Sequence, residues 1–451
     1  MLVALILALL GVLLLAPPLS THPRTPSLAA AVCVGMGAVV LSGQLKLLDM
    51  ATGLWAQDAA TEFAQLIVLA ATLIAITLQR DRPQDAVAPG ALVLAAASAS
   101  ALASATHALT AIGGELALGV TLAITLKPVG QRINGLLWAG GAGVIVTAVG
   151  AVTLGWVTHG AGLDRVAIDA QALPRGPLLA GAGILVCLGL SPFSLLLPGG
   201  VWLGRSRRIP AALLAWILSV LPVVGILPCW RLTRSLHELE AVIGGEWRTI
   251  LAAVAVASLG VSTWQALRQR CLRRMWCWLG IGNAALFAFG LAAGTEGARI
   301  EAALAGHACA SLIGHSGAAG VLTMAEGWWG GNTRLQRFVG LGQRNPFLGV
   351  SLVGFLVLLS AVPFTAGFFP KLHLLLAGMS GGLTWLVVLL ALGLTWVGLI
   401  GLRTARILFH VRDKGRPEPL VGSPGLTLLV GLLGCAALAL GVRPLTVAWG
   451  Y

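Results

Sequence analysis

The sequence predicts an all-α, polytopic membrane protein of about fourteen transmembrane helices, and three observations support this fold class. First, 57% of the 451 residues are hydrophobic and only 10% are charged, with a mean hydropathy of +0.92, whereas soluble domains carry about 25% charged residues. Second, apolar runs recur along the whole chain, and most approach the length of about 20 residues that a helix needs to cross the hydrocarbon layer. Third, basic residues fall in short bursts between these runs, as they do in cytoplasmic loops.

The apolar runs define the expected helices. The first run, Met1 to Leu15, resembles the hydrophobic part of a signal peptide, but it lacks a positively charged start and a clear small-residue cleavage motif. We therefore expect it to be the first membrane-spanning helix. The fourteen runs lie near residues 1–16, 27–48, 60–78, 89–105, 108–126, 133–157, 176–198, 210–230, 249–267, 275–294, 300–325, 346–378, 384–402 and 425–442.

The distribution of lysine and arginine tests this count. When the loops are assigned alternately to two sides, 20 of the 29 basic residues fall on one side and eight on the other, while Lys371 lies inside a span. The eight are Lys46, Arg165, Arg175, Arg231, Arg234, Arg248, Arg299 and Arg443. Because cytoplasmic loops are enriched in basic residues, the first side is predicted to be cytoplasmic. Both termini are then expected on the non-cytoplasmic side.

Two apolar runs are interrupted by paired prolines. Pro192 and Pro198 interrupt one run, and Pro363 and Pro370 interrupt another. Proline removes a backbone donor and breaks a helix, and paired broken helices are typical of transporter repeats. The alternative is two ordinary proline kinks. We expect a single membrane domain over 1–451, with three N-terminal helices in 1–80, two inverted five-helix repeats in 88–232 and 249–410, and a last helix in 420–451.

Other function classes are disfavoured by composition. The net charge of +13 and the pI of about 10.6 would suit nucleic acid, but no basic face with interleaved aromatic residues accompanies them. The seven cysteines form no CxxC pair, and most lie inside apolar runs, so we interpret them as buried inert thiols. The sequence predicts no metal site, no bound cofactor and no nucleic-acid partner, and the lipid bilayer is the expected surrounding.

Ionisable residues inside spans are costly and indicate function by default. Glu115 lies in an apolar helix with no basic residue within one turn. A carboxyl group in such a place favours its protonated form, which makes it a plausible proton carrier. Lys371 directly follows the second interrupted segment, and a buried lysine can load and release a proton. The alternatives are a structural carboxylate and a lysine that extends to the membrane interface.

A polar stripe marks another predicted helix. His307, Ser311 and His315 are spaced four residues apart and share one face of a helix that is otherwise rich in Ala, Gly and Leu. Two imidazoles on one face could line a hydrated proton path, or they could form hydrogen bonds between helices. We interpret Asn283, a polar residue in the preceding span, as structural.

Taken in order, these motifs resemble the antiporter-like membrane subunits, in particular subunit N of bacterial respiratory complex I, the NADH:quinone oxidoreductase. The most specific stretch, residues 340–371, is similar to the family's GLGRRNP…AGIPPTAGFIGKF. The segment around Glu115 is similar to GIEL, and Asp58 with Phe63 is similar to VDGFA. A length near 450 residues disfavours the larger subunit L, and a lysine rather than a glutamate at position 371 disfavours subunit M.

The resemblance implies a mechanism and a setting. Quinone reduction elsewhere in the complex would drive a proton along a central polar axis, in which Glu115 and Lys371 would match the family's glutamate and lysine. The partners would be other membrane-arm subunits in the inner (plasma) membrane of a bacterium. The complex would use NADH, FMN, iron–sulfur clusters and quinone, none of them bound by this chain, so that the chain would belong to an enzyme only as a subunit.

The chain departs from the family pattern at two lysine positions. Cys187 stands at the first of these positions, and Val223, or Pro222 with a shift of one residue, stands at the second. Valine and proline do not titrate, and a buried thiol is a poor relay at neutral pH. Either water and the histidine stripe bridge the gap, or the subunit no longer pumps. A subunit of a cation/proton antiporter or membrane-bound hydrogenase, and a non-pumping structural subunit, remain as alternatives.

Overall fold

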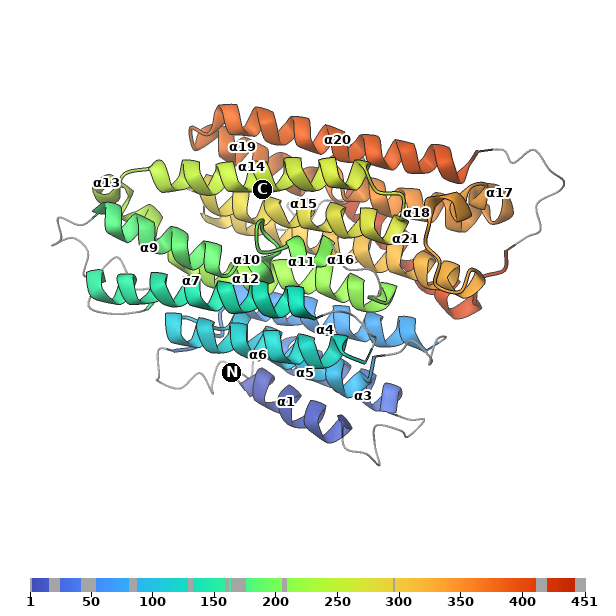
Figure 1. The fold of residues 1–451 in the computed structure, drawn as a ribbon, viewed down its shortest axis with the longest axis horizontal. Helices are drawn as coiled ribbons and strands as arrows, with labels where there is room; N and C mark the ends of the chain where they lie inside the picture. The colour runs from blue at the N-terminus through green and yellow to red at the C-terminus, as the bar shows by residue number, and fades with distance from the viewer. Residues whose placement is uncertain are drawn as a thin grey trace.

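The computed structural model describes residues 2–15, 25–41, 54–80, 87–128, 133–158, 162–163, 176–204, 209–294, 297–410 and 420–442. Within these ranges the regular structure is helical, and the only β pairing consists of isolated bridges. The helices run roughly side by side in one bundle (Figure 1).

The helices in chain order are α1 (Leu2–Leu15), α3 (Thr25–Leu41), α4 (Ala59–Gln79), α5 (Pro89–Ala103), α6 (Ala108–Leu126), α7 (Asn134–Thr158), α9 (Gly176–Gly189), α10 (Ser191–Ser194), α11 (Val201–Gly204), α12 (Ala211–Glu238), α13 (Glu240–Ile243), α14 (Glu246–Leu267), α15 (Leu272–Ala293), α16 (Gly297–Trp328), η4 (Leu335–Phe338), α17 (Leu341–Arg344), α18 (Pro346–Leu358), α19 (Phe368–Ser380), α20 (Thr384–Leu408) and α21 (Pro424–Val442).

The predicted membrane fold is confirmed. In the part of the chain that the structure describes, nine helices are long and apolar enough to cross a membrane, and five shorter apolar helices accompany them. These helices correspond one to one with the fourteen predicted apolar runs. Helices are the expected solution, because each satisfies its own backbone hydrogen bonds where no water is present.

Three helices form the centre of the bundle. α12 and α15 are buried along their whole apolar length and α16 nearly so, whereas most residues of α7 and α21 are not buried. α12 packs against α4, α5, α9, α15 and α16. The outer helices expose large aliphatic and aromatic side chains, for example Trp138 and Leu402, as expected where lipid replaces water. Polar side chains inside α12, α15 and α16 are therefore shielded from the surroundings over most of these helices.

α12 extends further than predicted. The apolar run was expected to end near residue 230, but the helix continues to Glu238 and contains Pro222 and Pro228 in its interior. A proline removes one donor from a helix, and enclosure by neighbouring helices allows the helix to continue past the loss. The added C-terminal turns carry Arg231, whose side chain is buried.

Two predicted spans are interrupted at the expected places. Between α9 and α12 the described residues form the short helices α10 and α11, with Leu195 in the left-handed region at φ +56°. Between α18 and α19 the irregular segment 359–367 contains Phe364 at φ +65°. Pro192 lies in α10 and Pro363 in the irregular segment, whereas Pro198 follows α10 and Pro370 lies in the first turn of α19.

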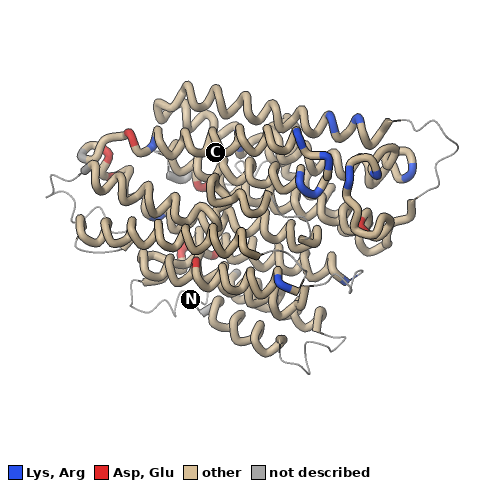
Figure 2. Tube along the Cα trace, viewed as in Figure 1, with Lys and Arg blue, Asp and Glu red and all other residues tan. Residues whose placement is uncertain are grey.

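The charges are unevenly distributed along the bundle. Figure 2 shows most of the described lysine and arginine residues at one end of the helices, near α17 and the start of α15. We call this the arginine-rich end. Such an asymmetry is typical of membrane proteins that follow the positive-inside rule.

Candidate functional site

Lys371 lies at the second helix break and is fully buried, with 1% of its surface exposed. Its Nζ donates hydrogen bonds to the carbonyl oxygens of Leu358, Leu359 and Ser360, at 3.3, 2.9 and 3.0 Å. These carbonyls are free because α18 ends there, and the last carbonyls of a helix have no partner within it. They also form the negative end of the helix dipole. The break therefore creates the site that holds the ammonium group.

Gly367 makes this arrangement possible. A Cβ atom at this position would lie 2.2 Å from the carbonyl oxygen of Leu358 and 3.0 Å from Nζ of Lys371. The first atom belongs to the backbone and cannot move aside without shifting the end of α18. The absence of a side chain thus allows α18, the irregular segment and Lys371 to approach closely.

The predicted polar stripe lies on α16 and faces α15. Asn283 on α15 donates from Nδ2 to Oγ of Ser311 at 2.7 Å, and its backbone carbonyl lies 3.0 Å from Nε2 of His307. Trp276 on α15 donates from Nε1 to Nδ1 of His315 at 3.0 Å. All three stripe residues are buried, and both imidazoles lie close enough to Lys371 for electrostatic interaction.

These contacts fix the tautomers of the two histidines. Nε2 of His307 faces a carbonyl oxygen and must carry a hydrogen, which leaves Nδ1 as an acceptor without a partner among the described residues. Nδ1 of His315 accepts a hydrogen bond, so Nε2 carries the hydrogen and is a donor without such a partner. One open acceptor and one open donor therefore lie on the same helix face.

Glu115 lies on α6 and is completely buried. Neither carboxyl oxygen has a hydrogen-bond partner within the described ranges, and Thr147 on α7 faces the group outside hydrogen-bonding geometry. An unpartnered carboxyl group in an apolar interior is unfavourable unless it is protonated or hydrated. Glu115 is therefore a buried ionisable side chain whose carboxyl oxygens lack hydrogen-bond partners among the described residues.

Two thiols lie beside Glu115. Cys187 on α9 and Cys229 on α12 are within hydrogen-bonding reach of each other, and Glu115 interacts electrostatically with Cys229. Val223, at the other replaced lysine position, is also buried on α12. The sequence singled out Cys187 but treated Cys229 only as an inert thiol. Nothing in its spacing indicated that α9 and α12 bring the two together.

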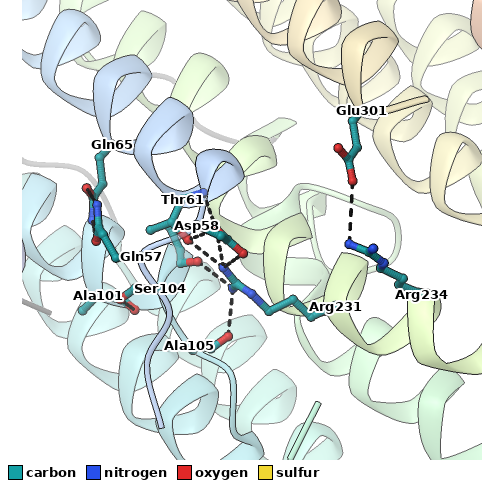
Figure 3. A network of polar contacts seen from close by, with 11 residues as sticks. Gln57, Asp58, Thr61, Gln65, Ala101, Ser104, Ala105, Arg231, Arg234 and Glu301 are labelled. Carbon is teal, nitrogen blue, oxygen red and sulfur yellow. Dashed lines mark hydrogen bonds and ion pairs between the residues drawn. The ribbon is translucent and has the colours of Figure 1, made fainter. Parts of the chain in front are cut away.

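A second polar network ties α12 to the helix ends around it (Figure 3). Arg231 donates to the carbonyl oxygens of Ala103 and Ala105 at 2.8 and 2.9 Å, to Oγ1 of Thr61 at 2.6 Å and to the Asp58 carboxylate at 3.2 Å. Asp58 also caps α4 by accepting from the Thr61 backbone amide at 2.8 Å. Burial alone would raise the pKa of Asp58, but Arg231 and the bonds from Thr61 outweigh burial and hold the pKa below its ordinary value.

A buried ion pair lies near the arginine-rich end. Arg273 on α15 contacts Glu326 on α16, and both side chains are largely shielded. The pair neutralises one of the consecutive arginines, Arg273 and Arg274, at the start of α15. Among the described residues, no group of three or more His, Cys, Asp or Glu side chains is arranged to hold a metal ion.

Comparison with known proteins places this arrangement in a family. Residues 163–395, more than half of the chain, match the family described as NADH:quinone oxidoreductase/Mrp antiporter, TM. This chain belongs to that family. The matched range begins before the first break and ends beyond the second. The family resemblance predicted from the motifs is therefore confirmed.

Relatives within the family carry one name. The NADH-quinone oxidoreductase subunit N of Cutibacterium acnes is 27% identical over 298 residues, which are 63% of this chain and 53% of that protein. The subunit N of Cereibacter sphaeroides is 28% identical over 443 residues, which are 94% of this chain and 92% of that protein. The second alignment extends the likeness to almost the full length.

Solved structures show the same fold. A chain of respiratory complex I from Thermus thermophilus superposes with a TM-score of 0.78 at 21% identity, covering 98% of this chain and 97% of that one. A chain of the Mrp complex from Dietzia superposes with a TM-score of 0.80 at 14% identity, covering 99% and 94%. At these identities the likeness establishes the antiporter-like fold of this family member.

Proposed function

We propose that this chain is a membrane-arm component, similar to subunit N, of a bacterial NADH-quinone oxidoreductase. In this role it translocates protons across the inner membrane while other subunits oxidise NADH and reduce quinone. FMN and iron–sulfur clusters would belong to those subunits. The name shared by the sequence relatives supports the assembly, and the buried ionisable groups support the proton path.

The observation that carries the proposal is the pair Lys371 and Glu115. Both are completely shielded inside a membrane bundle, and neither has a counter-ion among the described residues. Charged groups at membrane depth are expensive and mark ion pathways or proton relays. A structural role alone would favour a paired charge, such as that of Arg273 and Glu326.

The geometry supports different roles for the two groups. Lys371 is held at the end of α18 by three carbonyl oxygens, so it can exist charged and can pass a proton when its environment changes. His307 and His315 lie beside it with one open acceptor and one open donor, which suits a relay through intervening water. Glu115 would exchange protons within the first proposed repeat, residues 88–232.

The proposed path lacks an identified proton carrier between Glu115 and Lys371. A continuous relay from Glu115 to Lys371 would need titratable or hydrated groups, whereas Cys187 and Cys229 are buried thiols and Val223 is a buried aliphatic residue. Ordered water must bridge this region if protons pass through it. The same observation favours a second candidate, a structural subunit that no longer pumps. The likeness to the Mrp complex favours a third, an antiporter-like subunit of a cation/proton antiporter or a related hydrogenase assembly.

The orientation and the repeats form part of the proposal. The arginine-rich end would face the cytoplasm, which leaves both termini on the opposite side. The ranges 88–232 and 249–410 would form two inverted five-helix repeats, each with its fourth helix broken. The presence of the breaks in α9–α11 and α18–α19 supports this division.

The test measures proton translocation in membrane vesicles that contain the assembled complex. Glu115→Gln and Lys371→Met remove the two buried titrations, and Glu301→Gln and Lys127→Met remove a carboxyl and an ammonium group at helix surfaces or ends as matched controls. We expect both test variants to assemble and to lose the share of translocation that passes through this subunit, while the controls pump normally. Unchanged proton translocation per quinone reduced in both test variants would instead support a non-pumping structural subunit.

A further inference from the structure

An open cavity of about 600 Å³ lies at the arginine-rich end of the bundle. It is formed by the loop between α14 and α15, the first turn of α15, the segment around η4 and the end of α20. Four arginines line it, one from each of these elements: Arg270, Arg274, Arg334 and Arg403. Leu335, Val339 and Ile407 add apolar surface. No part of the proton path proposed above contributes to it.

The charges in this cavity are unbalanced. Among the described residues that line it there is no aspartate or glutamate, and the buried Glu326 on α16 is engaged by Arg273. Arg403 is anchored, because its guanidinium donates to the backbone carbonyls of Leu267 and Gln269. Four like charges directed into one concave site repel one another, and a multiply bonded anion would relieve that repulsion.

Arg270, Arg274 and Arg334 are available for such an anion. Within the described ranges their side chains form no hydrogen bond, and none of them belongs to an ion pair. Guanidinium groups match phosphate oxygens through paired N–H donors. Arg403 ties α20 to the loop that carries Arg270 through the carbonyl oxygen of Gln269.

The cavity has the surroundings expected at the level of the membrane surface. Next to it, Arg268 stacks 5.7 Å from the ring centre of Trp264, whose side chain is exposed near the end of α14. Tryptophan is enriched at the boundary between hydrocarbon and headgroups. Two exposed leucines precede Arg403 on α20. Leu399 lies one helical turn before it, and Leu402 lies directly before it. A lipid-facing apolar surface therefore leads directly to the arginines.

We propose that this cavity binds the phosphate headgroup of an anionic phospholipid, whose acyl chains lie along the exposed face of α20. Basic pockets at the cytoplasmic ends of transmembrane helices suit such headgroups. The headgroup would join α14, α15, η4 and α20 at one point. A free phosphate anion shares the charge chemistry but would make no use of the apolar surface beside Arg403.

The experiment measures binding of fluorescently labelled phosphatidylglycerol and phosphatidylcholine to the full chain in neutral detergent. The test variant is Arg270→Gln with Arg334→Gln. The control is Arg337→Gln with Arg406→Gln, which removes the same charge at the same end from residues outside the cavity lining. Each basic residue near an anionic headgroup contributes about fivefold in affinity. We expect the test pair to weaken phosphatidylglycerol binding by about 25-fold, the control pair by less than threefold, and phosphatidylcholine to bind weakly throughout.

Three results would overturn the proposal. Equal binding of the two lipids would show that the headgroup charge is not recognised. An equal loss in the control pair would show a general surface-charge effect. Complete displacement of the lipid by inorganic phosphate at physiological concentration would show a site for a soluble anion. If the double variant unfolds, Arg270→Gln alone, at an exposed position, is expected to weaken binding by about fivefold.

Discussion

Lys371 and Glu115 show how a single buried side chain depends on its immediate surroundings. The carbonyl oxygens at the end of α18 surround the lysine ammonium, whereas the glutamate has no such partners in the described structure. The sequence alone predicted both residues, because an ionisable residue in an apolar run is conspicuous. It could not predict the three carbonyls, because they become available only where α18 ends in space beside α19.

Gly367→Ala tests the close approach at the second break. The new methyl group would meet the Leu358 carbonyl oxygen and Nζ of Lys371, and overpacking of this kind costs about 1–3 kcal/mol. We expect a lower thermal unfolding temperature of the purified protein in detergent, monitored by intrinsic tryptophan fluorescence. Gly354→Ala on α18 is the matched control, because a Cβ atom there meets nothing within 4 Å. Equal unfolding temperatures of the two variants would contradict the packing described at Lys371.

Trp276→Phe tests the tautomer of His315. The substitution removes the donor at 3.0 Å from Nδ1 and leaves a second ring nitrogen without a partner. Leaving a buried acceptor unsatisfied costs about 1–3 kcal/mol. We expect a destabilised but folded protein and a change in the ring-nitrogen chemical shifts of a ¹⁵N-histidine-labelled sample. An unchanged His315 spectrum would contradict the hydrogen bond.

At the scale of the elements, Arg231 links the C-terminal turns of α12 to two neighbouring helices. The side chain joins the start of α4 to the end of α5 through four different residues (Figure 3). The sequence treated Arg231 as a loop residue, because the apolar run stops just before it. The extra turns of α12 and the position of Asp58 come from tertiary contacts, which hydrophobic patterning does not report.

The network gives a defined dependence of stability on pH. The pKa of Asp58 is lower in the folded protein than its ordinary value of about 3.9, so the folded state binds this proton less readily than the unfolded state does. The contribution to stability is therefore complete above about pH 4 to 5 and is lost as the pH falls through the folded pKa. We expect the difference in unfolding temperature between the wild type and Asp58→Asn to be constant from pH 8 to 5. It should shrink below pH 4, and a difference that grows on acidification would contradict the direction of this shift.

The start of α18 supplies another test at this scale. Asn345 accepts from the Leu348 amide through Oδ1 and donates from Nδ2 to the Leu420 carbonyl, both at 3.0 Å. It thus caps α18 and ties it to the segment before α21. We expect Asn345→Ala to lower the free energy of unfolding by about 1 kcal/mol or more, measured by denaturant titration. Asn345→Asp keeps the cap acceptor and should recover part of that loss, whereas equal losses in both variants would indicate that the cap contributes nothing.

At the scale of the whole molecule, composition and charge distribution were sufficient to predict the fold class and the number of spans. Apolar runs report membrane helices directly, because each span must satisfy its own backbone. The order of helices around α12, α15 and α16 was not predictable, since all spans are similarly apolar and hydrophobicity does not select one neighbour over another. For the same reason, the meeting of Cys187 and Cys229 beside Glu115 follows only from the fold.

The assembly provides the most direct test of the central claim that this chain is a membrane-arm subunit similar to subunit N. A terminally tagged chain would be purified from its native membrane in mild detergent, and the co-purifying proteins would be identified by mass spectrometry. The proposal predicts NADH-oxidising and quinone-reducing subunits together with other antiporter-like subunits. Recovery with hydrogenase or cation-antiporter subunits would move the chain to another assembly of its family, and recovery alone as a single monodisperse species would contradict the claim.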